Sequence, residues 1–507
     1  MDRRELDMSP AEIAADSLGF FRWGRIAGKV LVTNDAGDWG FFTEPEFNDL
    51  LAGRIVEGHP RFLEAQSKGL LRDGLDLDAL AERVAQRNGH VHRGPYLHVV
   101  TLTLRCDDAC SYCRALRPTP VEADCDMSVE TAEKIVNLAL QSTSPSMTFE
   151  FQAQGGEPLR NFDVLRRFVE LARSSNSLAA GKTLSFRLIS NCTGMTEEAA
   201  EWLIANDVQL CTSLDGPANL HDANRKWKHG NRHAEVVRWI EYFTRRYAEL
   251  GRDAKLWHVD ALLTTTRQTL GAWREVVDEY VTRGLRTIDL RPLSPVGFAR
   301  DAWSTVGYTP VEYHDFYRHA LDYILELNGR GVEIMERTAT IFLTKILTAE
   351  DPGIVDVQSP VGAGTGQIAY NVDGRVFPCD EARLVDATGD SIFELGDVGG
   401  LTASEITRHP TVRAIAAASL LDTQPMCADC WNKPFCGFSP VVNFATQGDL
   451  FGQRPHCFQC KDHMAVSTKL FESLANESDT GTAEIFKRWT TLGPQLASDR
   501  RALMEAP

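Results

Sequence analysis

Three closely spaced cysteines constrain the fold and chemistry of this chain more than any other feature. Cys106, Cys110 and Cys113 have the spacing C-x3-C-x2-C and follow a strand-like apolar run at residues 97–104. A closed iron–sulfur cluster normally has four cysteine ligands, so a triad leaves one iron open to chemistry. A structural zinc site is the alternative, but zinc also takes four ligands, usually in paired C-x2-C arms, and no such arm follows nearby. The triad predicts an open cluster on a loop at the carboxyl end of a strand.

A glycine-rich turn follows the next strand-like run. The segment Phe149-Glu-Phe-Gln-Ala-Gln-Gly-Gly-Glu-Pro contains Gly155, Gly156 and Glu157. Two glycines allow a backbone to approach a ligand closely, and the glutamate offers an acceptor for a cation. Gly-Gly turns are common, so the segment indicates a ligand site only in combination with the cysteine triad that precedes it.

Together the two motifs resemble those of radical S-adenosylmethionine (radical SAM) enzymes. The resemblance implies that the cysteine triad holds a [4Fe-4S] cluster whose open iron binds S-adenosylmethionine (SAM). It also implies that Gly155, Gly156 and Glu157 hold the methionyl ammonium of SAM. The turn is two residues longer than the expected Phe-Gln-Gly-Gly-Glu-Pro, so we expect its path before the glycines to differ.

Composition limits the classes of partner. The chain has 507 residues, enough for more than one domain, and a formal net charge of -17 without a basic block. This charge argues against nucleic acid and anionic membranes as partners. No apolar run is long enough to span a membrane, and the first residues lack the apolar core of a signal peptide. Twelve cysteines in such a chain favour metal ligation in a reducing cytoplasm over disulfides, so we expect a soluble cytoplasmic protein.

The middle of the chain alternates between strand-like and helix-like segments. Six apolar runs predict strands, and the amphipathic segments between them predict helices. The runs cover residues 97–104, 147–151, 183–189, 208–214, 256–263 and 286–290. Six such units predict an α/β fold whose parallel sheet curves into a partial (β/α)6, TIM-like barrel, with its site at the carboxyl ends of the strands. The radical SAM resemblance implies the same fold.

Polar residues end the third and fourth predicted strands. Ser190 and Asn191 follow the third strand, and Ser213 and Asp215 follow the fourth in a segment that continues to Arg225. On spacing alone these residues favour turns. Similar Ser-x-Asp-Gly-Pro…His-x3-Arg segments mark peptide- and protein-modifying radical SAM enzymes. That resemblance assigns Ser190, Asn191, Ser213 and Arg225 to the ribose and carboxylate of SAM, whereas Asp215 is interpreted as mainly structural.

A second group of cysteines lies towards the carboxyl terminus. Cys427, Cys430 and Cys436 have the spacing C-x2-C-x5-C, and Cys457 and Cys460 follow. By spacing alone, this group holds either zinc or an iron–sulfur cluster. The segment resembles the SPASM extension of radical SAM enzymes, which carries auxiliary [4Fe-4S] clusters. The resemblance assigns one auxiliary cluster to Cys427, Cys430, Cys436 and Cys457, with Cys460 as a substitute for Cys457.

Ligands for a second auxiliary cluster are missing from this extension. The SPASM pattern has cysteine where this chain has Val361 and Pro440, so we expect Cys379 not to be a ligand. In related sulfatase-maturing enzymes, an aspartate directly after this cysteine accepts a proton from the substrate radical. The resemblance therefore makes Asp380 the candidate catalytic residue. The alternative is a turn aspartate that pairs with Arg383.

Residues 1–95 predict a separate α+β domain. Two strand-like segments flank a hairpin signal at Ala27-Gly28, a third strand covers 39–42, and Thr43 with Glu46 has the spacing of a capping box. A small sheet followed by helices resembles the domains that bind leader peptides by adding a strand to an exposed edge. A domain that only buttresses the barrel is an equal alternative.

These boundaries divide the chain into four parts. The expected barrel covers residues 96–335, the cysteine-rich SPASM-like domain covers 336–474, and a helical or flexible tail covers 475–507. Taken whole, the chain is most similar to the His-Xaa-Ser system radical SAM maturases, on segments from residues 31–37 to 373–383. The resemblance implies an oxidoreductase that modifies a ribosomally made precursor peptide, bound through its leader, by crosslinking, epimerisation or oxidation.

The implied cofactors are SAM, the open [4Fe-4S] cluster and one auxiliary [4Fe-4S] cluster. The resemblance also implies an external electron donor of the flavodoxin or ferredoxin type. Three alternatives stay open. The chain could mature a folded enzyme such as a sulfatase, act without catalysis as a zinc-binding interaction protein, or bind SAM as a regulator that never cleaves it.

Overall fold

A computed structural model of the chain describes residues 13–115, 125–152, 155–179, 181–226, 231–476 and 478–491. The residues that lengthen the glycine-rich turn, Ala153 and Gln154, lie outside these ranges, as does the part of the predicted tail beyond residue 491. Within the described ranges, every helix is too short or too polar to cross a membrane.

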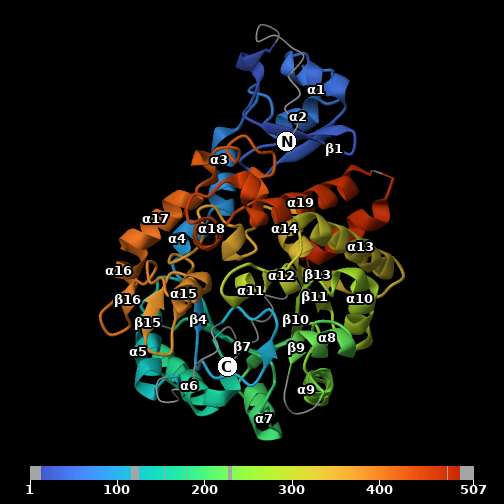
Figure 1. The fold of residues 1–507 in the computed structure, drawn as a ribbon. Coiled ribbons are helices and arrows are strands. Elements are labelled where there is room, and N and C mark those ends of the chain that lie inside the picture. The colour runs from blue at the N-terminus through green and yellow to red at the C-terminus, as the bar shows by residue number, and fades with distance from the viewer. Residues whose placement is uncertain are drawn as a thin grey trace.

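A large, mostly parallel sheet forms the centre of the molecule. Six of its strands lie side by side in chain order and run parallel to one another. They are β4 (Leu97–Val100), β6 (Ser146–Phe151), β7 (Thr183–Ser190), β8 (Val208–Ser213), β10 (Asp260–Thr264) and β12 (Leu290–Arg291). The predicted α/β class is therefore confirmed, and Figure 1 shows the helices that connect these strands around the sheet.

Amphipathic helices cover the outer face of this sheet, where the sequence places them. They include α5 (Val129–Ala139), α6 (Phe162–Ala179), α7 (Glu197–Ala205), α9 (Arg232–Glu249), α10 (Trp273–Thr282) and α13 (Pro310–Gly329). The hydroxyl of Ser128 caps α5 by accepting a hydrogen bond from Thr131 N at 3.0 Å.

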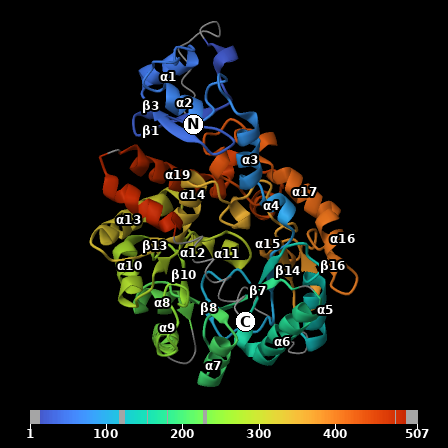
Figure 2. The same ribbon diagram turned by 180° about the vertical axis from the view of Figure 1, so that it is seen from behind.

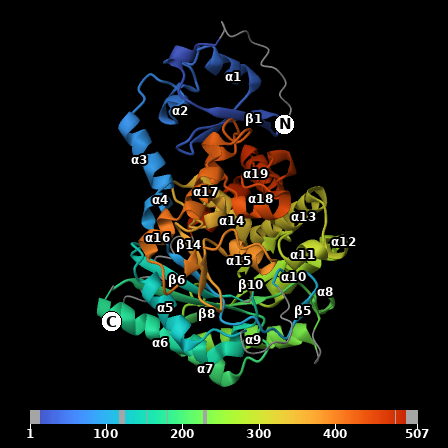
Figure 3. The same ribbon diagram turned by 60° about the vertical axis from the view of Figure 1, so that its left-hand side comes forward.

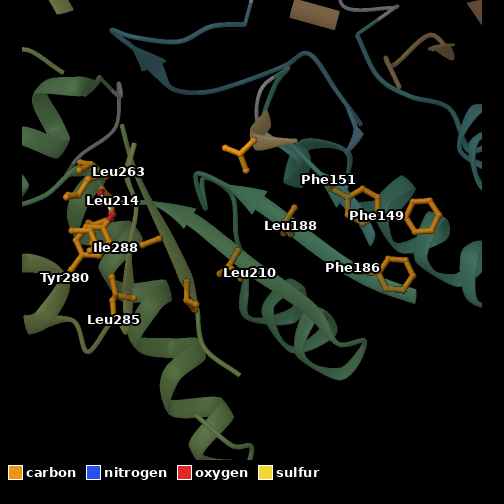
Figure 4. Packing of buried hydrophobic residues seen from close by; sticks show 14 of the residues in the cluster. Phe149, Phe151, Phe186, Leu188, Leu210, Leu214, Leu263, Tyr280, Leu285 and Ile288 are labelled. Atoms are coloured by element: carbon orange, nitrogen blue, oxygen red, sulfur yellow. Dashed lines mark hydrogen bonds between the residues drawn. The ribbon is translucent and has the colours of Figure 1, made fainter. Parts of the chain in front are cut away.

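Aromatic side chains fill the core between sheet and helices. Phe149 of β6 and Phe186 of β7 stack with their ring centroids 5.9 Å apart, and Phe168 of α6 meets the ring of Phe149 edge-on at 5.1 Å. Figure 4 shows the rings of Phe149 and Phe186 with Leu188 and Leu210 of the neighbouring strands. The alternation of buried and partly exposed residues along β6 and β7 fixes the register, because a slip by one residue would expose this face.

Three predicted strands are wrong in their bounds. The run at 97–104 forms a strand only as far as Val100. The run at 256–263 forms a strand only from Asp260, and the run at 286–290 divides between β11 (Thr287–Ile288) and β12. β11 leaves the main sheet and pairs with β13 (Met335–Glu336). The division follows from the Glu336 carboxylate, which accepts a hydrogen bond from Leu290 N at 3.2 Å between the two pairings.

The carboxyl-terminal region continues the same sheet. β14 (Gln367–Tyr370) pairs parallel with β4, and β15 (Arg375–Phe377) and β16 (Gly396–Asp397) extend it as antiparallel strands. Helices complete the region: α14 (Arg337–Leu347), α15 (Asp380–Ala387), α16 (Ala403–Arg408), α17 (Pro410–Ser419), α18 (Pro440–Gln447) and α19 (Phe458–Ala475). Figure 3 shows most of these helices between the N-terminal unit and the parallel sheet.

The N-terminal unit has the predicted hairpin and capped helix. β1 (Arg22–Ile26), β2 (Lys29–Thr33) and β3 (Trp39–Phe42) form an antiparallel sheet in that order. Ala27 and Gly28 make the turn, with φ angles of 50° and 74°, values that glycine adopts readily. Four helices follow: α1 (Glu44–Leu51), which has both hydrogen bonds of a capping box, α2 (Phe62–Ser67), α3 (Leu77–Arg87) and α4 (His90–Arg93).

This unit packs tightly on the carboxyl-terminal helices. The rings of Trp39 and Phe41 meet Phe471 of α19 at centroid distances of 5.3 and 6.2 Å. The indole N–H of Trp39 donates a hydrogen bond to Ile346 O at 2.8 Å. Seen from behind, β1 and β3 lie directly above α19 (Figure 2). A further helix at 480–491 buries Phe486 and Trp489, so this part of the predicted tail also joins the core.

Candidate functional site

The loop with the cysteine triad is pinned at both ends. It leaves β4, and Leu104 N donates a hydrogen bond to Cys125 O at 2.8 Å. In its middle, β5 (Ala109–Cys110) pairs antiparallel with β9 (Arg225–Lys226), so Cys110 lies opposite Arg225. Burial raises the pKa values of Cys106 and Cys110, and the charges of their neighbours in the triad raise them further. The three cysteines thus share one loop whose path these contacts fix.

The glycine-rich turn packs directly on this loop. A Cβ on Gly155 would lie 2.3 Å from Thr101 Cγ2, and one on Gly156 would lie 2.5 Å from Arg105 O. Both distances are too short for any side chain, so only glycine fits here. Glu157 N donates a hydrogen bond to Arg105 O at 2.8 Å. The two sequence motifs therefore share one surface at the ends of β4 and β6.

Glu157 joins the turn to the end of β7. Its fully buried carboxylate accepts hydrogen bonds from Ser190 Oγ at 2.6 Å and from Asn191 N at 2.8 Å. Asn191 Nδ2 in turn contacts Cys106 Sγ at 3.6 Å. Burial raises the pKa of Glu157 to about 7, although these hydrogen bonds favour the charged form. Four predicted site residues from three strand ends thus meet at one point.

We predict a pH-dependent loss of stability that originates at Glu157. Its pKa rises from 4.5 to about 7 on folding, so the metal-free protein should lose stability as the pH rises through this window. The loss should total about 3 kcal/mol, because one pKa unit corresponds to about 1.4 kcal/mol. Urea denaturation of wild type and Glu157→Gln between pH 4.5 and 8 measures this slope. Glu198→Gln, at an exposed position of α7, should keep the wild-type slope. The prediction would be wrong if the free energy of unfolding of Glu157→Gln fell with pH as steeply as that of wild type.

A buried polar network holds Cys110 from the other side. Arg225 donates from Nε to Asp215 Oδ2 at 3.1 Å, and its Nη1 contacts Cys110 Sγ at 3.9 Å. Tyr112 donates its hydroxyl proton to the same Asp215 oxygen at 2.6 Å. Asp215 thus connects Tyr112 and Arg225 through hydrogen bonds. Ser213 ends β8 opposite Leu262, and no hydrogen bond joins its hydroxyl to another described residue.

Sequence reasoning missed one buried ion pair within the loop. Asp108, between the first two cysteines, pairs with Arg232 of α9 at 3.2 Å, and both side chains are 1% exposed. Burial raises the pKa of Asp108, and the charges of Arg232 and Arg225 oppose this rise. The partners lie far apart in the chain and belong to no shared motif, so nothing in the sequence signals this contact.

The carboxyl-terminal cysteines also lie near one another. Burial, together with the charges of Cys460, Cys430 and Cys457, raises the pKa of Cys427 to about 12. Burial raises the pKa of Cys436 as well, with Cys460, Cys430 and Cys427 as its charged neighbours. No three or more His, Cys, Asp or Glu side chains in the described ranges lie close enough to hold one metal ion.

Three cations act on these thiols. The charge of Arg454 lowers the pKa values of Cys427, Cys457 and Cys460. Arg22 acts in the same way on Cys430, and Lys345 on Cys436. Arg454 is buried, and its Nε and Nη1 make no hydrogen bond within the described residues. These cations oppose the larger effect of burial, which raises the pKa of each of these thiols.

Asp380 begins α15 and is 3% exposed. Its Oδ1 accepts hydrogen bonds from Arg383 Nη2 at 2.9 Å and Nε at 3.2 Å. This is the pairing with Arg383 expected if Asp380 has no catalytic role. The position is nevertheless a helix start and not a turn, which corrects that interpretation. The other oxygen, Oδ2, is buried and has no partner among the described residues. Asp380 thus combines a fixed orientation with one unused acceptor.

The surroundings of Asp380 connect it to the cysteine triad. Glu381 lies 3.9 Å from Arg114, the residue directly after Cys113. Cys379 packs in one apolar cluster with Val361, which stands where the SPASM pattern has cysteine. An apolar partner at this position gives Cys379 the environment of a buried small hydrophobe.

Comparisons with known proteins find several relatives of this chain. No protein-family model matches the chain. The cysteine-type anaerobic sulfatase-maturating enzyme of Clostridium perfringens is 26% identical over 311 residues, which cover 59% of this chain and 76% of the relative. The serine-type anaerobic sulfatase-maturating enzyme of Bacteroides thetaiotaomicron is 31% identical over 140 residues, 27% of this chain and 33% of that protein. Relatives of this chain therefore include anaerobic sulfatase-maturating enzymes.

Solved structures share the fold. The structure of anSMEcpe with bound AdoMet covers 78% of this chain and 99% of its own, with a TM-score of 0.63 and 19% identity. Streptococcus suis SuiB bound to precursor peptide SuiA covers 87% of this chain and 98% of its own, with a TM-score of 0.51 and 13% identity.

Proposed function

We propose that this chain is a radical SAM maturase that uses a 5′-deoxyadenosyl radical to modify a ribosomally made peptide. The observation that carries the proposal is the meeting of the cysteine triad, the glycine-rich turn and the Glu157–Ser190–Asn191 contacts at the ends of β4, β6 and β7. The fold that this chain shares with an AdoMet-bound structure supports it. We further propose that the parallel strands form a partial (β/α)6 barrel around this site.

The residues present fit an open [4Fe-4S] cluster with SAM. The three thiols of the triad share one loop, Arg225 lies beside Cys110, and glycines leave space where a side chain would clash. When bound, the group supplies the 5′-deoxyadenosyl radical, chemistry that belongs to the cofactor. The chain's part is to hold the iron through the triad and the methionyl ammonium through the turn of Gly155, Gly156 and Glu157. The ribose and carboxylate of SAM would contact Ser190, Asn191, Ser213 and Arg225.

One auxiliary [4Fe-4S] cluster would be held by Cys427, Cys430, Cys436 and Cys457. The buried cations around these thiols support this assignment, because a group of thiolates needs compensating charge. Cys460 lies close to the same thiols and is the substitute ligand. An external donor of the flavodoxin or ferredoxin type would supply the electron for SAM cleavage.

Asp380 is the proposed proton acceptor from the substrate. Its unpartnered Oδ2 can take a proton, while Arg383 fixes the orientation of the carboxylate. The Arg114–Glu381 contact keeps this helix start beside the cysteine triad. Asp380→Asn would keep the shape of the site and remove the base, so it should lower product formation more than SAM cleavage.

The N-terminal unit is the proposed site for the leader peptide. β3 is an edge strand of its sheet, and an edge strand can pair with an extended peptide through backbone hydrogen bonds. The SuiB structure with its precursor peptide supports a peptide substrate. The structure also favours a buttressing role, because Trp39 and Phe41 pack on α19. The two roles are compatible, since packing uses side chains and pairing uses the backbone.

Maturation of a folded sulfatase is the second candidate function. The names of the curated relatives favour it. Both candidates use the same radical and differ in substrate. The His-Xaa-Ser system is the finer proposal within the peptide-modifying class.

One experiment separates these functions. Anaerobically reconstituted protein should hold about eight irons, because each of the two [4Fe-4S] clusters, the open one and the auxiliary one, contains four. With dithionite and SAM it should release 5′-deoxyadenosine, and failure to do so would contradict the radical SAM proposal. Mass spectrometry after co-expression with a neighbouring precursor peptide, or with a sulfatase peptide that contains cysteine or serine, then identifies the substrate class.

A further inference from the structure

A buried arginine beside the carboxyl-terminal cysteines has two unused donors. Arg454 begins a short 3₁₀ helix, Arg454–His456, directly before Cys457, and it is 6% exposed. Its Nη2 donates a hydrogen bond to Phe451 O, and its Cζ lies 3.8 Å from the centroid of the Phe438 ring. Its Nε and Nη1 are buried and have no hydrogen-bond partner among the described residues. These contacts hold the guanidinium in place while two of its N–H groups stay unsatisfied.

No ion pair joins Arg454 to a carboxylate in the part of the chain that the structure describes. Asp462 is the carboxylate that acts on this cysteine group, but it contacts His314 Nε2 at 3.1 Å, and the charges that act on it are those of His314 and Lys461. The charge of Arg454 acts on three thiols, those of Cys427, Cys457 and Cys460. Metal ligation converts thiols to thiolates, so a metal bound here would supply the counter-charge that this guanidinium lacks.

Arg454 differs in this respect from the other two cations near these thiols. Arg22 forms an ion pair with Asp35 at 2.9 Å, and the charge of Asp351 acts on Lys345. A cation with its own carboxylate contributes less net charge to a neighbouring group, because the two opposite charges largely cancel. Of the three cations, Arg454 is therefore the one whose full charge is available to a group held by the cysteines.

A second buried side chain in the same cysteine segment is also unsatisfied. Asn432, two residues after Cys430, is 1% exposed, and neither its Oδ1 nor its Nδ2 has a hydrogen-bond partner among the described residues. The main-chain N–H groups of Asn432 and Lys433 act on the thiol of Cys430 and oppose the rise that burial causes in its pKa. Buried polar atoms without partners are rare in folded proteins. Their presence here indicates a bound group that completes the hydrogen bonding of this segment.

We propose that Arg454 donates hydrogen bonds from Nε and Nη1 to sulfur atoms of the auxiliary [4Fe-4S] cluster and raises its reduction potential. The inference rests on the proposed function, because it takes Cys427, Cys430, Cys436 and Cys457 to hold that cluster. Reduction adds one negative charge to the cluster, and a buried cation with N–H donors stabilises the more negative state. Burial strengthens this effect, because solvent ions screen a buried charge less than an exposed one. Arg454 is thus a positioning residue that sets the electron affinity of the cluster.

A redox titration of the reconstituted full-length enzyme, followed by electron paramagnetic resonance, tests this directly. The variant with Cys106→Ala, Cys110→Ala and Cys113→Ala identifies the auxiliary signal, because it lacks the ligands of the open cluster. Arg454→Met should make reduction roughly tenfold less favourable, the effect of losing a hydrogen bond to a charged group, and for one electron this lowers the potential by about 59 mV. Lys461→Met is the matched control. This exposed lysine also acts on Cys460, but solvent screens its charge, so the potential should stay nearly unchanged.

A conservative variant keeps the test decisive if Arg454→Met assembles no cluster. Arg454→Lys keeps the charge and loses the planar fork of donors, so its potential should lie between those of wild type and Arg454→Met. A potential of Arg454→Lys equal to that of wild type would overturn the proposal. Equal potentials of wild type and Arg454→Met, or an equal fall in Lys461→Met, would overturn it as well.

Thermal unfolding of the metal-free chain separates this role from a purely structural one. Arg454→Met removes a buried cation that has no carboxylate partner, so the midpoint should stay unchanged or rise. A lower midpoint together with an unchanged potential would make Arg454 a structural residue. A wild-type chain with about four irons and no auxiliary signal would overturn this inference together with the auxiliary assignment. Release of 5′-deoxyadenosine by that chain would show that the radical SAM proposal still holds.

Discussion

Replacing Cys106, Cys110 and Cys113 together by alanine is expected to abolish SAM cleavage. Once these thiolates are removed, no other described cysteine group lies at the ends of β4, β6 and β7. The reconstituted variant should hold about four irons instead of about eight, because the carboxyl-terminal cysteines keep theirs. Chromatographic measurement of 5′-deoxyadenosine after dithionite reduction, together with iron analysis, checks both expectations.

The control for this variant is Cys211→Ala. Cys211 lies on β8, beside the site but outside the triad, and its replacement should keep both the iron and the cleavage activity. Continued release of 5′-deoxyadenosine by the triple variant would refute the cluster assignment. Loss of all iron from the triple variant would instead show that assembly at the two cysteine groups is coupled.

Local signals in the sequence predict local structure well here. The capping box of Thr43 and Glu46 and the hairpin at Ala27-Gly28 both form as predicted. Each depends on residues only a few positions apart, so its energetics are contained in the segment itself. The same holds for the alternating apolar pattern of β6 and β7, which places the site at their ends.

Contacts between distant segments are the part that the sequence does not predict. The pairing of β14 with β4 and the Asp108–Arg232 ion pair depend on where the chain returns after long intervals. The predicted strand at 286–290 fails for a related reason, since its second half is set by the distant Glu336 carboxylate. The orphan oxygen of Asp380 likewise becomes visible only when its neighbours are in place.

The docking of the N-terminal unit on the segment between Cys427 and Cys436 is another contact between distant parts of the chain, and it has a large functional consequence. Thr33 Oγ1 donates a hydrogen bond to Trp431 O at 2.8 Å, and Arg22 Nε donates to Ala428 O. Gly24 lies against the Trp431 ring. The main chain between Cys427 and Cys436 is therefore held by β1 and β2. The N-terminal unit thus positions three of the four proposed auxiliary ligands.

Gly24→Val is therefore expected to remove the auxiliary cluster and spare the open one. A Cβ at Gly24 would lie 2.3 Å from Trp431 Cδ1, so the valine must displace the indole and the loop that carries it. Iron should fall from about eight to about four per chain, while 5′-deoxyadenosine is still formed. Gly271→Val is the matched control, because a Cβ there meets no atom within 4 Å. About eight irons in Gly24→Val would show that the segment between Cys427 and Cys436 keeps its shape without this contact to the N-terminal unit. The unit would then serve peptide binding alone.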